Sequence, residues 1–209
     1  MKLAIFGASG RTGRPLVQQA LDAEHDVIAL VRTPATFPLK HERLTVVQGD
    51  VLNPADVDKV VQGADAVLSV LGHSKNSPKD MQTVATKNIL AAMETYGVPR
   101  LVILSGASVY VPQDQPKLIN HVMKFVTKAI AGPVLADGEQ CMNILQDSNL
   151  DWIIVRGPML NEGPHTGKYR VGWTGVNTGI HISRADVADF MLKQVTDNTY
   201  IHQAPLVSN

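Results

Sequence analysis

The sequence has a single cysteine, Cys141, so it contains neither an intramolecular disulfide bond nor a CxxC site. The 19 Lys and Arg residues balance 19 Asp and Glu residues, which argues against the basic surface that nucleic-acid binding needs. No apolar run approaches the roughly 20 residues that a membrane span needs. The first predicted strand begins almost at Met1 and leaves no room for a signal peptide. We therefore expect a cytoplasmic protein with no nucleic-acid or membrane partner.

Several catalytic patterns are also missing. The seven histidines form no i, i+4 pair on a predicted helix, so we expect no metal site. The sequence has no GxSxG motif and no complete P-loop. Short-chain dehydrogenases usually place a lysine four residues after a catalytic tyrosine, but the four tyrosines here are followed at that spacing by Arg100, Asp114, Trp173 and Ala204. This argues against a standard carbonyl–alcohol dehydrogenase, which needs an activated phenol.

The remaining pattern is typical of an α/β protein. Short apolar runs without alternation, which indicate strands buried on both faces, cover residues 2–6, 26–31, 44–48, 64–70, 100–104 and 152–155. Predicted helices cover residues 13–23, 54–62, 79–96, 115–131, 134–146 and 183–195, and a tail strand lies near 201–207. This order predicts a Rossmann-type doubly wound parallel sheet, in a single domain over residues 1–209.

One segment differs from this pattern. Residues 157–179 are rich in glycine and proline, and Tyr169, Val171 and Trp173 alternate within them. We predict a loop with a short strand at the carboxyl edge of the sheet. Residues 157–181 thus form a small substrate-side extension of the domain.

The strongest motif is a glycine-rich turn. The string Gly7-Ala8-Ser9-Gly10-Arg11-Thr12-Gly13 follows the first strand directly and opens a helix. Glycines at this spacing let the chain turn tightly, let a pyrophosphate approach the backbone, and let the helix pack closely on the strand. The motif predicts a dinucleotide site, and the alternative is a tight turn with no ligand.

The end of the second strand indicates which dinucleotide binds. An NAD site usually has an acidic residue there for the ribose 2′-hydroxyl, whereas this strand ends in Val31-Arg32-Thr33. Arg32 suits a 2′-phosphate and can stack on the adenine, and Arg11 supplies a second positive charge. We therefore expect NADP(H), unless Arg32 is only a solvated charge at a strand end.

Two further loops at strand ends fit the same site. Asp50 and Val51 follow the third strand, and an aspartate there often accepts the adenine amino group. Leu71 and Gly72 follow the fourth strand, where the backbone passes close to the ribose. Asp50 has an alternative role as the cap of the helix that begins near Pro54.

The catalytic half is less informative. Ser105 and Ser108 follow the fifth strand and are expected at the nicotinamide end. They are candidates for orienting a substrate or water. A serine there also serves equally well to satisfy backbone groups.

These motifs carry a family resemblance. The strings at 5–13, 30–32, 49–52, 56–59, 65–67, 71–72, 88–93, 182–183 and 190–192 resemble the flavin reductase (biliverdin-IXβ reductase) branch of the NmrA-like atypical short-chain dehydrogenases. The likeness covers nearly the whole chain and is densest before Gly106.

The resemblance implies an NADPH-dependent enzyme that passes hydride to a planar conjugated acceptor, such as a flavin, a bilin or a quinone. Stacking over the nicotinamide at about 3–3.5 Å then supplies most of the catalysis. It places the nicotinamide over Ser105, Pro158 and Met159, under a covering segment at 157–179. The family's contact serine corresponds to Gly106 here and its histidine to Met159. Both departures lie on the substrate side.

Two other functions remain open at this stage. A non-catalytic NADP(H)-sensing regulator fits the same cofactor motifs together with the substrate-side departures. A sugar-nucleotide epimerase or dehydratase is disfavoured by the missing tyrosine–lysine pair and the short carboxyl-terminal region. The sequence leaves the physiological acceptor and the oligomeric state open.

Overall fold

The computed structural model describes residues 1–74, 76–107, 109–116 and 118–209, and within them eight strands form one sheet in the order β3-β2-β1-β4-β5-β6-β10-β8. The strands are β1 (Lys2–Phe6), β2 (Asp26–Val31), β3 (Leu44–Gln48), β4 (Ala66–Ser69), β5 (Arg100–Gly106), β6 (Asp151–Gly157), β8 (Arg170–Gly172) and β10 (Leu206–Ser208). All neighbours from β3 to β10 pair in parallel, and β8 is antiparallel. This is the predicted Rossmann-type sheet.

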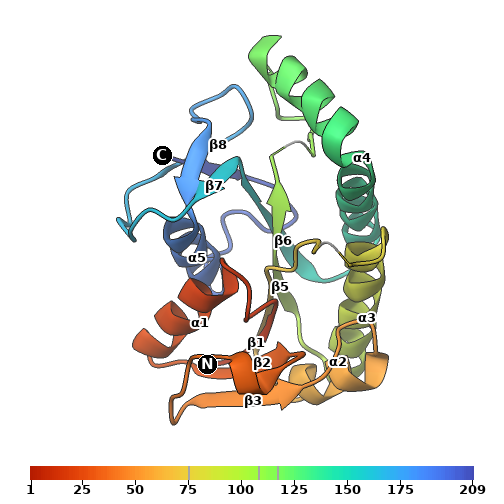
Figure 1. Ribbon diagram of the computed structural model, residues 1–209, viewed down its shortest axis with the longest axis vertical. Helices are drawn as coiled ribbons and strands as arrows, with labels where there is room; N and C mark the ends of the chain where they lie inside the picture. The colour runs from red at the N-terminus through yellow and green to blue at the C-terminus, as the bar shows by residue number, and fades with distance from the viewer. Residues whose placement is uncertain (75, 108, 117) are drawn as a thin grey trace.

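Helices cover both faces of the sheet. α1 (Gly13–Asp22) and α5 (Arg184–Lys193) pack together on one face, and α2 (Pro54–Val61), α3 (Met81–Tyr96) and α4 (Leu118–Gln146) cover the other (Figure 1). Successive side chains of β1 point alternately into the cores on the two faces of the sheet. Leu3 and Ile5 belong to the core under α1 and α5, whereas Ala4 and Phe6 belong to the core under the other helices. Burial on both faces explains why the strands are unbroken apolar runs.

Local capping signals set several helix ends. The Asn53 side chain accepts a hydrogen bond from the Ala55 N–H, and Pro54 begins α2. Gly97 ends α3 with φ +68°, a left-handed conformation that glycine adopts without strain. These ends lie within about two residues of the predicted ones.

Two predicted elements differ from the structure in their extent. The helices predicted at 115–131 and 134–146 are both present within α4, separated by the non-helical backbone of Ala131 (φ −134°, ψ 35°) just before Pro133, but the first of them begins at Leu118. The predicted tail strand at 201–207 is shorter in the structure, where β10 covers only Leu206–Ser208. His202 has a left-handed φ of +57°, so the chain is not extended at the start of the predicted strand. Neither α4 nor any other helix in the described part of the chain is long and apolar enough to cross a membrane.

The segment predicted as a substrate-side loop contains more pairing than expected. β7 (Met159–Asn161) pairs in parallel with β9 (His181–Ser183) as a small second sheet. β8 pairs with β10 at the edge of the main sheet. The segment is therefore held at both of its ends.

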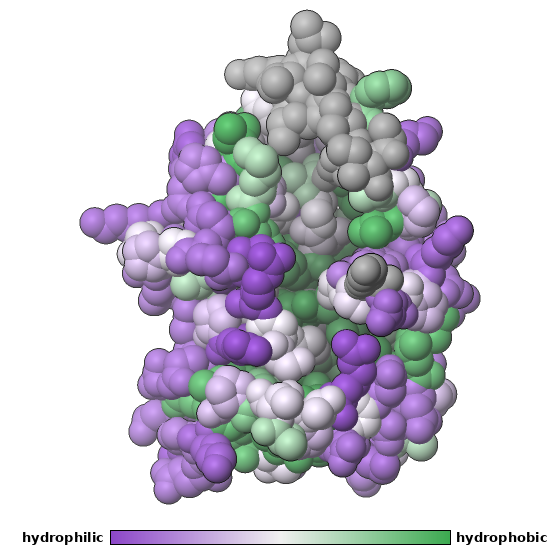
Figure 2. All heavy atoms as spheres, in the orientation of Figure 1, coloured by the Kyte–Doolittle hydropathy of each residue, from purple (hydrophilic) through white to green (hydrophobic). Residues whose placement is uncertain are grey.

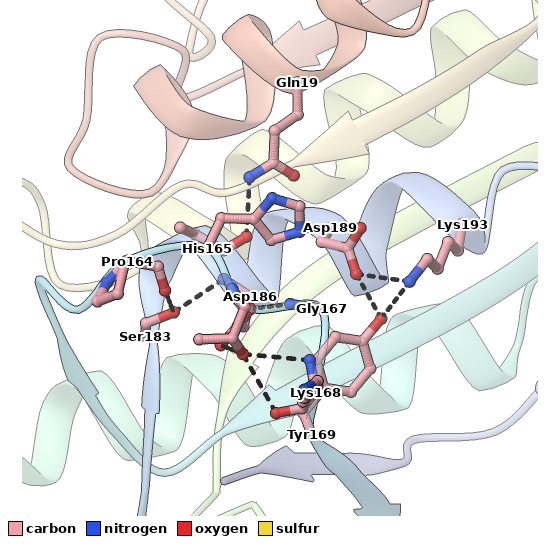
Figure 3. A network of polar contacts seen from close by, with 12 residues as sticks. Gln19, Pro164, His165, Gly167, Lys168, Tyr169, Ser183, Asp186, Asp189 and Lys193 are labelled. Carbon is pink, nitrogen blue, oxygen red and sulfur yellow. Dashed lines mark hydrogen bonds and ion pairs between the residues drawn. The ribbon is translucent and has the colours of Figure 1, made fainter.

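The middle of this segment is held by the buried carboxylate of Asp186 on α5 (Figure 3). Its Oδ1 accepts the Thr166 N–H at 2.7 Å and the Gly167 N–H at 2.9 Å, and its Oδ2 accepts the Thr166 hydroxyl at 2.9 Å. Burial raises the pKa of Asp186, but these hydrogen bonds outweigh burial and the pKa lies below its ordinary value. The carboxylate thus anchors the loop to the helix.

Replacing Asp186 with asparagine should lower the free energy of unfolding by about 1–3 kcal/mol, because one oxygen that accepts hydrogen bonds becomes a donor. A depressed folded-state pKa stabilises the fold above the unfolded-state pKa of roughly 3.9 and ceases to do so as the pH falls through the folded-state value. The difference from the parent protein in denaturant titrations should therefore be constant above about pH 5 and shrink at lower pH. Asp147→Asn, at an exposed position, is the control. A pH-independent difference would contradict this account.

Candidate functional site

The sheet changes direction between β1 and β4. These strands are neighbours, but β2 and β3 lie beyond β1 whereas β5 and β6 lie beyond β4. The loops that follow β1 and β4 therefore diverge and leave a crevice at the carboxyl edge. The crevice is a cleft of about 470 Å³. The predicted cofactor residues that line it are Gly7, Ser9, Gly10, Arg32, Asp50, Val51, Leu71 and Gly72.

The glycine-rich turn is shaped by backbone contacts. Gly7 has a φ of +82°, and a Cβ there would lie 2.7 Å from the Val70 carbonyl oxygen. A Cβ on Gly13 would overlap the Gly7 carbonyl oxygen, which already accepts the Gly10 N–H at 2.9 Å. Only glycine fits at these two positions, because backbone atoms occupy the space of a side chain.

The first turn of α1 has unpaired donors. In the described part of the chain, no protein acceptor meets the N–H groups of Arg11, Thr12 and Gly13. The first turn also contains no acidic residue. Free N–H groups and the positive end of the helix dipole together favour an anion such as a phosphate. The donor set of this turn therefore fits the pyrophosphate of a dinucleotide.

The two predicted arginines lie in different surroundings. Arg32 lines the cleft, and its guanidinium has no ion-pair partner among the described residues. Arg11 lies outside the cleft lining, and its Nη1 is 3.8 Å from Oε1 of Glu162. Glu162 also accepts a hydrogen bond from Arg184 at 2.7 Å. A role for Arg11 at the 2′-phosphate stays a prediction, since the free protein directs this side chain elsewhere.

The loop after β3 is held by its own hydrogen bonds. Asp50 Oδ1 accepts the Leu52 N–H at 3.0 Å, and the Asp50 N–H donates to Asp56 Oδ2 at 3.1 Å. The cap of α2 is Asn53, so Asp50 does not have the alternative role of helix cap. Asp50 instead lines the cleft within a fixed turn.

Ser105 lies in a second, smaller cavity of about 20 Å³ between the end of β5 and helices α3 and α4. Gly138 of α4 lies across from it, and a Cβ on Gly138 would be 3.8 Å from the Ser105 hydroxyl. Leu71 lines both this cavity and the larger cleft, so the two are adjacent. Ser105 thus lies just beyond the predicted ribose position.

The other predicted substrate-side residues lie elsewhere. Pro158 and Met159 line neither cavity, and Met159 is 53% exposed at the start of β7. Ser108 lies outside the described residues. The roles of these three residues stay predictions.

The structure contains a buried ion pair that the sequence analysis missed. Arg156 is fully buried, and its Nη1 and Nη2 donate to the two carboxylate oxygens of Asp114 at 2.7 and 2.8 Å. Asp114 also accepts the N–H groups of Val111 and Thr174. Burial raises the pKa of Asp114, but the bonds from Arg156 outweigh it and hold the pKa below its ordinary value. The ion pair joins the loops that follow β5 and β8.

The structure also pairs His73 with Asp137, which the sequence analysis did not single out. His73 Nε2 lies 2.8 Å from Asp137 Oδ2, and the Asp137 side chain is 1% exposed. The available sequence signal was a lone carboxylate on an otherwise apolar helix face, with Cys141 and Leu145 at the following helical positions.

A tyrosine–lysine pair does occur in space, away from both cavities. The Tyr169 hydroxyl donates to Asp189 Oδ2 at 2.6 Å and accepts from Lys193 Nζ at 3.0 Å (Figure 3). Burial, followed by the hydrogen bond to Asp189, raises the pKa of Tyr169 to about 12. This phenol stays protonated and ties its loop to α5, so it does not replace the missing catalytic pair.

Comparisons with known proteins agree with this geometry. A family model described as NAD(P)H-binding matches residues 7–198. The Photosystem II assembly factor Ycf39 of Synechocystis is 26% identical over 93% of this chain, and the chain spans 58% of that protein's length.

Two solved structures show the same fold. The oxidoreductase ylbE of Lactococcus lactis superposes with a TM-score of 0.83 at 22% identity, over 100% of this chain and 91% of that one. A short-chain dehydrogenase/reductase of Veillonella parvula in complex with NADP superposes with a TM-score of 0.81 at 21% identity, over 100% and 94% of the two chains.

Replacing Gly7 with alanine should cost at least about 2 kcal/mol, from the left-handed backbone and the contact with Val70. Gly106→Ala is the matched control, because nothing lies within 4 Å of a Cβ at that position. Thermal unfolding of both variants measures the effect. Equal melting temperatures would show that the turn does not depend on glycine.

Proposed function

The chain belongs to the NAD(P)H-binding family, and we propose that it is an NADPH-dependent reductase that passes a hydride to a conjugated acceptor such as a flavin or a bilin. The observation that carries the preference for NADPH is Arg32, an arginine that lines the cleft without an ion-pair partner among the described residues. This arginine directly follows β2, at the position where NAD sites usually have a carboxylate.

The cleft residues have distinct roles in this proposal. The free N–H groups of Thr12 and Gly13 hold the pyrophosphate. Arg32 binds the 2′-phosphate in a bidentate manner, and Asp50 faces the adenine. Gly72 lets the backbone approach the ribose, and the nicotinamide lies toward Ser105.

When NADPH is bound, it supplies the hydride, and the protein positions the acceptor against the nicotinamide. A planar conjugated acceptor needs no activated phenol, because its extended π system accommodates the incoming electrons. Reduction of a ketone needs a proton donor, which in short-chain dehydrogenases is usually such a phenol, and no tyrosine is among the described residues that line the two cavities. The chain's task is to stack the acceptor on the nicotinamide and to exclude water.

Apolar surface lies on the acceptor side. Met159 is 53% exposed and Ile180 is 51% exposed, and a backbone hydrogen bond of 3.1 Å joins the two residues. Figure 2 shows further apolar atoms recessed along the middle of one face, between polar rims. In the proposed reductase, the 157–179 segment covers the acceptor, and Met159 contacts it at the position where the family has a histidine.

A second candidate is a non-catalytic NADP(H)-binding regulator. It is supported by the name of one relative, an assembly factor, and by the two substrate-side departures, Gly106 and Met159. A regulator needs the cleft but no acceptor.

Oxidation of NADPH by the purified protein, followed by absorbance with a panel of flavins, bilins and quinones, tests the proposal. Turnover with a flavin or a bilin supports the reductase. Tight binding of NADPH with no turnover on the whole panel would overturn it and favour the regulator. NADH is measured in parallel.

Arg32→Ala should weaken NADPH binding by roughly 10- to 100-fold, because charged hydrogen bonds to a phosphate contribute about 1.5–3 kcal/mol. NADH binding should change little, since NADH lacks the 2′-phosphate. Titration of protein fluorescence with each dinucleotide measures both constants. Arg43→Ala, at an exposed position outside the cleft, is the control. Equal losses for the two dinucleotides would refute the 2′-phosphate assignment.

A further inference from the structure

The loop after β4 holds a histidine against a buried carboxylate. Asp137 of α4 accepts three hydrogen bonds: from the Gln82 N–H at 2.8 Å, from the Thr83 N–H at 2.9 Å, and from the His73 ring at 2.8 Å. The first two donors belong to the first turn of α3, whose own N-cap residue, Asp80, makes no side-chain cap. Asp137 therefore caps α3 from a different helix.

This arrangement defines the state of the histidine. The N-terminus of α3 favours a negative charge on Asp137. A carboxylate is an acceptor only, so His73 Nε2 carries the hydrogen of their bond. Nδ1, the other ring nitrogen, has no hydrogen-bond partner among the described residues. A histidine oriented through one nitrogen by a buried carboxylate is suited to moving a proton through the other.

His73 lies on the loop that borders the cleft, although its own side chain lines neither cavity. Its chain neighbours Gly72 and Ser74 both line the cleft. The Gln82 side chain, which lines the second cavity, donates to the Leu71 carbonyl oxygen at 2.8 Å. The His73 side chain is only 12% exposed, so it has little contact with water.

Other proton donors are absent from this end of the site. Among the described residues that line the two cavities, only Arg32, Asp50 and Cys141 have titratable side chains. Arg32 and Asp50 follow β2 and β3, on the far side of the glycine turn. Burial raises the pKa of the Cys141 thiol, whose sulfur accepts a hydrogen bond from Thr86.

We propose that His73, positioned by Asp137, donates the proton that accompanies hydride transfer to the acceptor. The proposal rests on the reductase function. The acceptor gains two electrons and one hydrogen with the hydride and needs one proton to become neutral. The Nδ1–H bond of the His73 imidazolium breaks, an N–H or O–H bond forms on the reduced acceptor, and water then returns a proton to Nδ1. Asp137 is a positioning residue.

The test compares His73→Gln with the parent protein. Glutamine keeps a donor toward Asp137 but does not supply an acidic proton. We expect kcat with the best acceptor of the panel to fall by about 100-fold, while the dissociation constant of NADPH stays within a factor of about 2, a change of roughly 0.4 kcal/mol. Imidazole added to His73→Ala should restore part of the rate. His41→Gln, at an exposed position outside both cavities, should match the parent.

A readout independent of turnover tests the positioning. Nitrogen NMR of the histidine rings should show that Nε2 of His73 carries a hydrogen in the free protein, and Asp137→Asn should alter the signals of this ring. A parent protein that turns over an acceptor, with His73→Gln equally active, overturns this inference and leaves the reductase intact. A parent protein that binds NADPH and reduces nothing overturns the reductase, and the proton donor with it.

Discussion

The contact between the turn after β1 and the backbone after β4 is the constraint on which the site depends. Gly7 packs against Val70 at the point where the sheet changes direction, and Gly13 packs against the carbonyl oxygen of Gly7. This close approach fixes where α1 begins, and its first N–H groups have no acceptor in the described part of the chain, because the first donors of a helix lack intrahelical partners. Side chains at these glycines would push the loop after β1 away from the loop after β4. The N–H groups expected to bind phosphate would then move away from the position expected for the ribose.

Buried carboxylates arrange the rest of the site in a common way. Asp186, Asp137 and Asp114 each accept backbone N–H groups from another part of the chain. Burying a charged carboxylate costs free energy unless its oxygens accept hydrogen bonds, and the oxygens of these three carboxylates do accept them. Each therefore fixes a loop at the carboxyl side of the sheet in one position.

The cofactor half of the site could be read from local patterns, whereas the acceptor half could not. Gly7 and Arg32 stand directly after buried strands, Gly72 follows another one three residues later, and the carboxyl ends of parallel strands meet at one edge. The pairing of His73 with Asp137 joins residues 64 positions apart, and that of Arg156 with Asp114 joins residues 42 apart. No local pattern encodes such distances.

By itself, the sequence determined the parallel strands, their order in the chain, most helix ends and the phosphate-binding turn, because apolar period, capping and glycine spacing act over a few residues. Only the tertiary structure decided which charges meet. It brought Arg11 near Glu162 and placed the Tyr169 hydroxyl beside Lys193 of α5. The reason is that long-range partners are selected by burial and packing, which exist only once the sheet has formed.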